Sequence, residues 1–216
     1  MRSPVALLML WSATAIADPA ATPPVPPPPP AVPAAPAPSE APGAVEDVPE
    51  ACRDFAKLAT SQSKNAALSA QISLATCLVD QRSKSLVLCD CEQSVLDVNA
   101  VLEPSLLMLD QVYVAGDPAT KILARHAQGE MLSSFAARML ATVPPPATNT
   151  EAATALRDTR LAMVQPLVQP WQARAQAVFS DLDKIARANP QLAKNAAVVA
   201  AVRSGRAKLS SGVAKR

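Results

Sequence analysis

The chain has 216 residues, among them 22 prolines and only 5 glycines, with 3% aromatic residues, 50% apolar residues and a formal net charge of +2. Scarce glycine, few aromatics and few β-branched runs argue against sandwiches, barrels and βαβ repeats, which use these residues in turns and strands. Because Ala and Leu are abundant, the composition predicts an all-α fold.

The first 17 residues have the features of a secretory signal peptide. Arg2 supplies a positive charge, an apolar stretch follows from Val5 to Ile16, and Ala15 and Ala17 form the small-x-small pattern of a cleavage site. This stretch is shorter than the roughly 20 residues that span a bilayer, and no later stretch is long and charge-free enough to do so. We expect cleavage after Ala17, a mature chain without a transmembrane segment, and a periplasmic or secreted location.

Residues 18–49 form a proline-rich segment that holds 13 of the 22 prolines. The segment contains four acidic residues and no Lys or Arg, and it has too few large apolar side chains to bury a core. We expect a disordered, extended leader, which either has no partner or is a ligand for a proline-recognising groove. Residues 50–216 are long enough for one domain.

Within that domain, residues 50 to about 82 carry apolar side chains at helical spacing, and the polar run at 61–65 is weak enough to be a break. A second helix is expected from about 85 to 116, where apolar residues recur in alternating steps of three and four. Pro104 lies inside this helix and should kink it.

Asp117 and Pro118 are typical of the N-cap and first position of a third helix, which should stop at the three prolines at 144–146. The remaining helical segments begin near Thr150, with interruptions at Pro166 and Pro170, and at Gln191, ending near Ser210. Short connections between amphipathic helices favour antiparallel neighbours, so we predict an antiparallel bundle of about four to six helices.

The four cysteines are an even number in a chain that we expect to be exported, so two disulfide bridges are the simplest interpretation. If one helix ends near residue 83 and the next starts near 85, Cys77 lies level with both Cys89 and Cys91. Cys89 and Cys91 point to different sides of the second helix, and the positions of these sides favour a Cys77–Cys89 bridge over a Cys77–Cys91 bridge. Cys52 can pair with another cysteine only if the chain breaks at 61–65; otherwise it stays free or links two chains.

Two other interpretations of the cysteines compete with structural bridging. Cys89 and Cys91 could form a C-x-C redox pair, but this needs a thiolate stabilised by a helix N-terminus or a cation, and Asp90 and Glu92 flank the pair instead. The cysteines could also bind a soft metal ion such as zinc or copper(I), although the spacing lacks the paired C-x-x-C units of such sites.

Little in the sequence is typical of an enzyme. His126 is the single histidine, and we interpret it as one half of an ordinary i,i+4 pair with Glu130 rather than as a catalytic base. There is no phosphate-binding glycine loop, no G-x-S-x-G and no dinucleotide fingerprint. We therefore predict no catalytic residue, no metal and no cofactor.

Charge is segregated along the chain. Residues 85–120 hold six acids and no base, whereas residues 191–216 hold six bases and no acid. These segments are either solvated or docked on each other, or the basic end contacts an anionic partner. Nucleic acid is not expected, because the aromatics are too scattered to form a stacking platform. The candidate basic contact face consists of Lys194, Arg203, Arg206 and Lys208.

These features predict a non-catalytic interaction or structural module of the bacterial cell envelope, whose partner is an envelope protein or an anionic surface. Two alternatives remain. One is a small binding protein that takes an apolar ligand or a metal between its helices, which would require a cavity of at least about 300 Å³ near residues such as Leu106, Met131 and Phe135. The other is a thiol-redox protein that uses Cys89 and Cys91.

Overall fold

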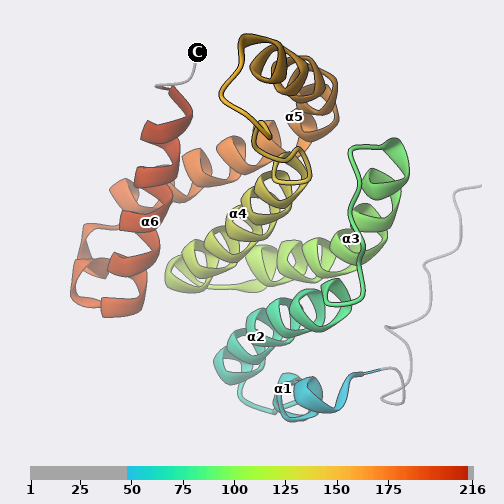
Figure 1. Cartoon of the computed structure of the whole chain (residues 1–216). Helices are drawn as coiled ribbons and strands as arrows, with labels where there is room; N and C mark the ends of the chain where they lie inside the picture. Colours follow the sequence, from blue (N-terminus) through green and yellow to red (C-terminus); the bar gives the residue numbers. More distant parts are fainter. Residues whose placement is uncertain (1–47, 214–216) are drawn as a thin grey trace, which may run out of the picture. The chain divides into compact units, whose positions relative to one another are not determined.

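The structure is a computed structural model that describes residues 48–213, and all of these lie within one unit of the chain, Pro42–Arg216. The predicted signal peptide and nearly all of the predicted leader fall outside the described residues. The described elements are the short 3-10 helices η2 (Glu50–Cys52) and η3 (Pro190–Lys194) and the α-helices α1 (Arg53–Ala59), α2 (Lys64–Ser83), α3 (Glu92–Ala115), α4 (Pro118–Leu140), α5 (Glu151–Ala188) and α6 (Ala196–Val213). The all-α prediction is confirmed, and six α-helices in this part of the chain lie within the expected range (Figure 1).

Helix boundaries follow the local sequence signals in most places. The expected break at 61–65 exists, because α1 ends at Ala59 and α2 begins at Lys64. The start of α4 is confirmed in detail: the Asp117 carboxylate accepts a hydrogen bond from the Thr120 amide at 2.8 Å, which satisfies one of the unpaired donors of the first turn. These boundaries depend only on residues close in sequence, so sequence patterns can locate them.

The start of α3 was expected near residue 85, and this prediction is wrong. The helix begins at Glu92, and residues 86–89 have no regular secondary structure. Leu86 and Leu88 still pack against the core from this connection, so their apolar spacing resembles that of a helix. Pro104 lies inside α3 as expected, and Figure 1 shows the helix changing direction along its length.

Prolines do not interrupt α5, contrary to expectation. Pro166 and Pro170 lie within one helix of 38 residues. Each proline removes a backbone hydrogen bond and crowds the preceding turn. Val164, Val168 and Trp171 from this stretch are nevertheless buried in the core, and the Trp171 indole donates to the Asn99 side chain at 2.9 Å. Tertiary packing therefore holds the helix continuous across a segment that local sequence disfavours.

The core is built around α4, which packs on α2, α3, α5 and α6 and makes its most extensive contact with α5. Gly129 permits that contact, because a Cβ atom there would lie 2.5 Å from the Phe179 ring of α5. Gly205 of α6 lies near the same ring, and a Cβ atom added there would be 3.2 Å from the nearest carbon of Phe179. Two glycines thus bring α4 and α6 close to one aromatic side chain of α5.

A polar cluster joins α3, α4 and α5 beside the apolar core. The Arg125 guanidinium donates to Asp181 at 3.0 Å and to Asp110 at 2.8 Å, and it also donates to the Gln128 side chain at 2.7 Å. Its planar group lies over the Tyr113 ring, 3.7 Å from the centroid. One arginine therefore satisfies two carboxylates on different helices.

Candidate binding site between α5 and α6

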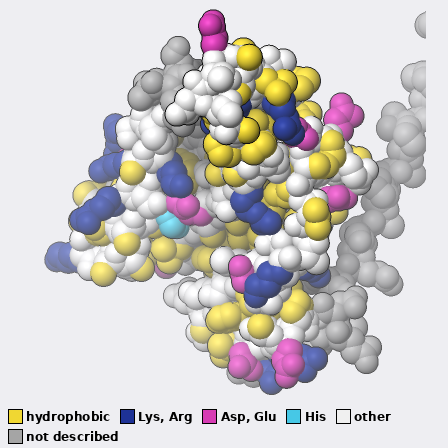
Figure 2. All heavy atoms as spheres, in the orientation of Figure 1, with side chains coloured by type: hydrophobic (Ala, Val, Ile, Leu, Met, Phe, Trp, Pro, Cys, Tyr) yellow, Lys and Arg dark blue, Asp and Glu magenta, His cyan; other side chains and the backbone are white. Residues whose placement is uncertain are grey.

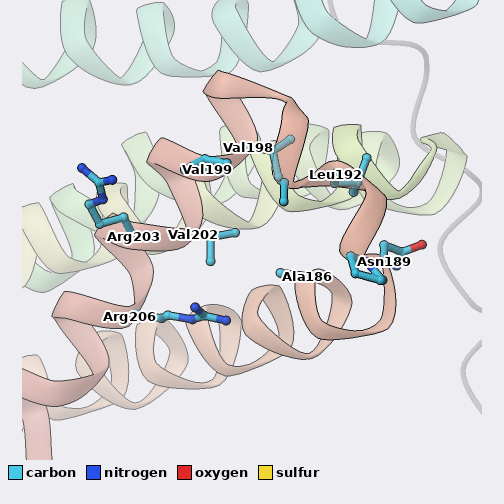
Figure 3. Close-up of a pocket in the computed structure, with 10 residues that line it drawn as sticks. Ala186, Asn189, Leu192, Val198, Val199, Val202, Arg203 and Arg206 are labelled. Carbon is cyan, nitrogen blue, oxygen red and sulfur yellow. The ribbon is translucent and has the colours of Figure 1, made fainter.

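The turn between α5 and α6 is formed by two asparagines and a proline. Asn189 ends α5, where its side-chain amide donates to the Ile185 carbonyl at 2.8 Å, and Pro190 begins η3. The Asn195 side chain accepts hydrogen bonds from the Ala197 and Val198 amides at 3.1 and 3.3 Å, as an N-cap does. These local signals fold the chain back, so that η3 and the first turns of α6 face the end of α5 (Figure 3).

A pocket of about 410 Å³ lies between these three elements. Its walls are mainly apolar, with Asn189 near the turn and two arginines from α6 (Figure 3); the lining consists of Ala186, Asn189, Pro190, Leu192, Ala193, Val198, Val199, Val202, Arg203 and Arg206. Val198 is buried, whereas Val199 is 36% exposed. The volume lies in the lower part of the range of small-molecule sites.

The charge at this pocket is positive. Arg206 extends from α6 toward α5 and donates to the Asp183 carboxylate at 2.7 Å, and Arg187 contacts the other oxygen of the same carboxylate at 2.7 Å (Figure 3). Burial raises the pKa of Asp183, but the two arginines more than offset this, so its pKa lies below the ordinary value. One carboxylate therefore serves two guanidinium groups, and no acid is among the pocket-lining residues.

The four residues of the predicted basic contact face are all exposed, but they differ in their ion-pair partners. Arg203 and Lys194 are exposed, and neither makes an ion pair with any residue that the structure describes. Lys208 instead lies 3.6 Å from the Glu130 carboxylate of α4, and Arg206 is bound to Asp183. Figure 2 shows basic side chains gathered over the α6 region of the molecule.

Both charged segments form ion pairs within the bundle, but among the described residues no ion pair joins one segment to the other. The basic α6 pairs with Glu130 of α4 and Asp183 of α5. The acids of residues 85–120 pair with arginines elsewhere, in the contacts Asp90–Arg160, Glu103–Arg174 and Asp110–Arg125. Net charge along the sequence therefore does not identify which residues meet.

A second depression, a groove of about 840 Å³, lies between α2 and α4. Met131 and Phe135 line it, as the ligand-binding alternative expected, whereas Leu106 is fully buried in the core and does not. Five Ser and Thr residues and charges of both signs also line this groove. It therefore favours no particular class of ligand, in contrast to the pocket between α5 and α6.

The preferred cysteine pairing is wrong. All four cysteines are bridged, but the pairs are Cys52–Cys77 and Cys89–Cys91. Cys52 reaches Cys77 because the chain breaks between α1 and α2, so that α1 packs against α2. This break is the condition under which the sequence predicted that Cys52 can pair with another cysteine. Cys89 and Cys91 precede α3 rather than lying within it, so the helical geometry that would point them apart does not apply.

His126 lies at the α2–α4 groove, where its Nε2 atom is 3.6 Å from a Glu130 oxygen, the i,i+4 pair that the sequence predicted. Burial lowers the pKa of His126, Glu130 opposes this effect, and Lys208 adds to it, with the net pKa below the ordinary value. No serine or cysteine hydrogen bond to this histidine is present among the described residues. The geometry fits an interfacial side chain.

The sequence did not predict the pocket itself. Leu192, Val198 and Val202 are spaced as core residues, and Asn189-Pro190 and Asn195 are turn and cap signals, but nothing local shows that the two helices leave space between them. The part of the chain that the structure describes contains no cluster of His, Cys, Asp and Glu able to hold a metal ion.

Among the described helices, none combines the length and apolarity required to cross a bilayer. No protein-family model, no curated protein and no solved structure matches this chain.

Proposed function

We propose that the protein is a non-catalytic binding module of the bacterial cell envelope, and that the pocket between α5 and α6 binds a small anionic amphiphile. The apolar part of the ligand lies against the valines of α6, and its anionic group lies at Arg203. The observation that carries this proposal is an apolar pocket whose only charged lining residues are two arginines.

Arg203 is the better partner for the anion, because Arg206 already donates to Asp183. Arg203 is exposed and free of ion pairs with the described residues, so binding an anion there breaks no existing contact. Two disulfide bridges that include every cysteine support an oxidising compartment, in agreement with the signal peptide expected at residues 1–17.

Decanoate is a suitable probe, since it combines a flexible apolar chain with one carboxylate. Titration of the mature protein, followed by methyl NMR, should shift the Leu192, Val199 and Val202 signals in a saturable manner. Octanoate should bind about 15-fold more weakly, because each buried CH₂ contributes about 0.8 kcal/mol. Decyltrimethylammonium, which has the same chain length and the opposite charge, should not saturate the same signals.

Two charge-reversal variants test the role of the arginine. Arg203→Glu should weaken decanoate binding roughly tenfold, since it replaces an attraction at the protein surface with a repulsion. Lys64→Glu makes the same charge change at the first residue of α2, outside the pocket, and should leave the affinity unchanged. Equal effects of both variants, or methyl shifts confined to Leu123 and Met131 in the groove between α2 and α4, would contradict the proposal.

A further inference from the structure

The two disulfide bridges lie in different environments. Cys52 is fully buried and packs with Leu74 and Leu78, and its partner Cys77 is half-buried at the edge of the same cluster. Cys89, in contrast, is exposed, and it lies in the connection between α2 and α3. Cys89 is therefore the more exposed residue when compared with Cys52 and Cys77, and it is the one that a dissolved thiol meets first.

Cys91 is the N-cap residue of α3, a helix of 24 residues, and no side-chain hydrogen bond caps this end of the helix. The partial positive charge and free amides of a helix N-terminus stabilise a thiolate at this position. The Ser94 hydroxyl accepts a hydrogen bond from the Cys89 amide at 2.7 Å and lies 3.2 Å from the Cys89 sulfur and 4.0 Å from the Cys91 sulfur. Ser94 is buried, so it holds the connection against the helix end.

The acid between the two cysteines is neutralised. Asp90 forms an ion pair with Arg160 of α5, in which the Arg160 Nε atom donates to the carboxylate at 3.0 Å and a second guanidinium nitrogen contacts the same oxygen. The hydrogen bond from Arg160 is the main reason that the pKa of Asp90 lies below its ordinary value. Glu92, the other flanking acid, is exposed to solvent. The flanking acids were the reason to doubt a redox pair, because they disfavour a thiolate. In the folded protein this effect is small, since Arg160 neutralises Asp90 and Glu92 is exposed to solvent.

We infer that Cys89–Cys91 is a redox-active disulfide that oxidises dithiols of other polypeptides by thiol–disulfide exchange, an activity separate from the proposed ligand binding. A partner thiolate attacks the Cys89 sulfur, the Cys89–Cys91 bond breaks, and its electron pair leaves on Cys91, where α3 stabilises the thiolate. A mixed disulfide then joins the partner to Cys89. Val87 is 89% exposed two residues before Cys89 and offers the partner chain an apolar contact.

The second step completes the exchange. The partner's other thiolate attacks the partner sulfur of the mixed disulfide, and Cys89 leaves as a thiolate that takes up a proton. The partner dithiol loses two electrons and two protons and becomes a disulfide, while Cys89 and Cys91 gain both electrons. One proton goes to Cys89, and the other is released to solvent while Cys91 remains a thiolate. Oxidation of the partner is the favoured direction, because stabilising the Cys91 thiolate stabilises the reduced form.

Equilibration of the oxidised mature protein in glutathione buffers, followed by alkylation and peptide mass mapping, tests this inference. The Cys89–Cys91 bridge should be half reduced at a GSH²/GSSG ratio at least 100-fold lower than the ratio needed for Cys52–Cys77. The oxidised protein should also convert a synthetic peptide with two cysteines to its disulfide, one peptide per molecule of protein. Equal reduction of the two bridges, or greater resistance of Cys89–Cys91, would overturn the inference.

Variants separate the role of the local charges from general stability. Arg160→Gln leaves Asp90 unpaired and should raise the required glutathione ratio at least threefold, whereas Arg174→Gln removes a similarly exposed arginine of the same helix, paired with Glu103, and should leave the ratio unchanged. In Cys89→Ser, the remaining Cys91 thiol should titrate below the ordinary value of about 8.5. A Cys91 pKa at or above that value, or equal effects of both arginine variants, would also contradict the proposed exchange.

Discussion

Arg125 is the side chain on which α3, α4 and α5 converge. It is 18% exposed and contacts carboxylates of two other helices, so it holds in place groups that would otherwise repel each other. Its neighbour Gln128 is buried and donates to Asp110 at 2.8 Å, which completes the set of partners. The sequence shows only an arginine on a helix with apolar neighbours, and nothing local identifies Asp110 and Asp181 as its partners.

Replacing this arginine tests its contribution to stability. Arg125→Met keeps an unbranched apolar stem but leaves Asp110 and Asp181 without their cation, and it should lower the free energy of unfolding by about 1.5–3 kcal/mol. Arg174→Met removes an exposed ion pair with Glu103 and should cost less than about 1 kcal/mol. Urea unfolding with unchanged m-values measures both. Similar losses in the two variants would show that the cluster is no more important than a surface pair.

Two glycines lie where α4 and α6 approach α5, but only Gly129 is required by this approach. A helix pattern predicts that each glycine lowers local stability, since glycine costs about 1 kcal/mol relative to alanine in a helix interior. The structure explains the exception at Gly129, where the Phe179 ring occupies the space that a Cβ atom would need. The side chain that requires this glycine is 50 positions away, so the sequence alone gives no reason for it.

The two glycines make a matched pair of variants. Gly129→Ala should lower the free energy of unfolding by about 1–2 kcal/mol, because a rigid ring must shift and overpacking exceeds the gain in helix propensity. Gly205→Ala should be nearly neutral, since its Cβ would lie 3.2 Å from the ring and the propensity gain offsets a small adjustment. Thermal or urea unfolding of both variants checks this order. A Gly129→Ala protein as stable as Gly205→Ala would contradict the packing argument.

An error in one predicted helix boundary leads to an error in the predicted tertiary contacts. Starting α3 near residue 85 instead of at Glu92 places both Cys89 and Cys91 on a helix, and the wrong bridge follows from that placement. In α5 the error has the opposite direction, because the sequence predicts interruptions in a helix that is continuous. Proline tends to end helices, but burial of Val164, Val168 and Trp171 outweighs this tendency.

For the molecule as a whole, the pH dependence of stability should reflect its single histidine. Burial lowers the pKa of His126, so on acidification the unfolded chain binds a proton first, at about pH 6.5. The corresponding stability is complete above that pH and is lost as the pH falls through the folded pKa. Wild-type protein should therefore lose stability as the pH falls below about 6.5, whereas His126→Gln should lose less.

Urea unfolding at several pH values, in wild type and in His126→Gln, measures this difference. Below about pH 4 both proteins should lose stability together, because the pKa values of Asp117 and Asp183 are also lowered in the fold and their protonation favours the unfolded chain. Parallel pH profiles of the two proteins from about pH 7 down to the onset of carboxylate protonation at about pH 4 would exclude the buried neutral histidine as the cause.

Local sequence patterns predicted the all-α class, the break before α2, the Asp117 cap and the turn at Asn189-Pro190, although the last α-helix begins at Ala196 rather than at Gln191. These features depend on backbone preferences and on side chains within a few residues of each other. The disulfide pairs, the partners of the charged residues and the pocket between α5 and α6 are evident only in the folded protein. Those features depend on which helix faces meet across long sequence separations, and a shift of a few residues in one helix boundary changes the contacts.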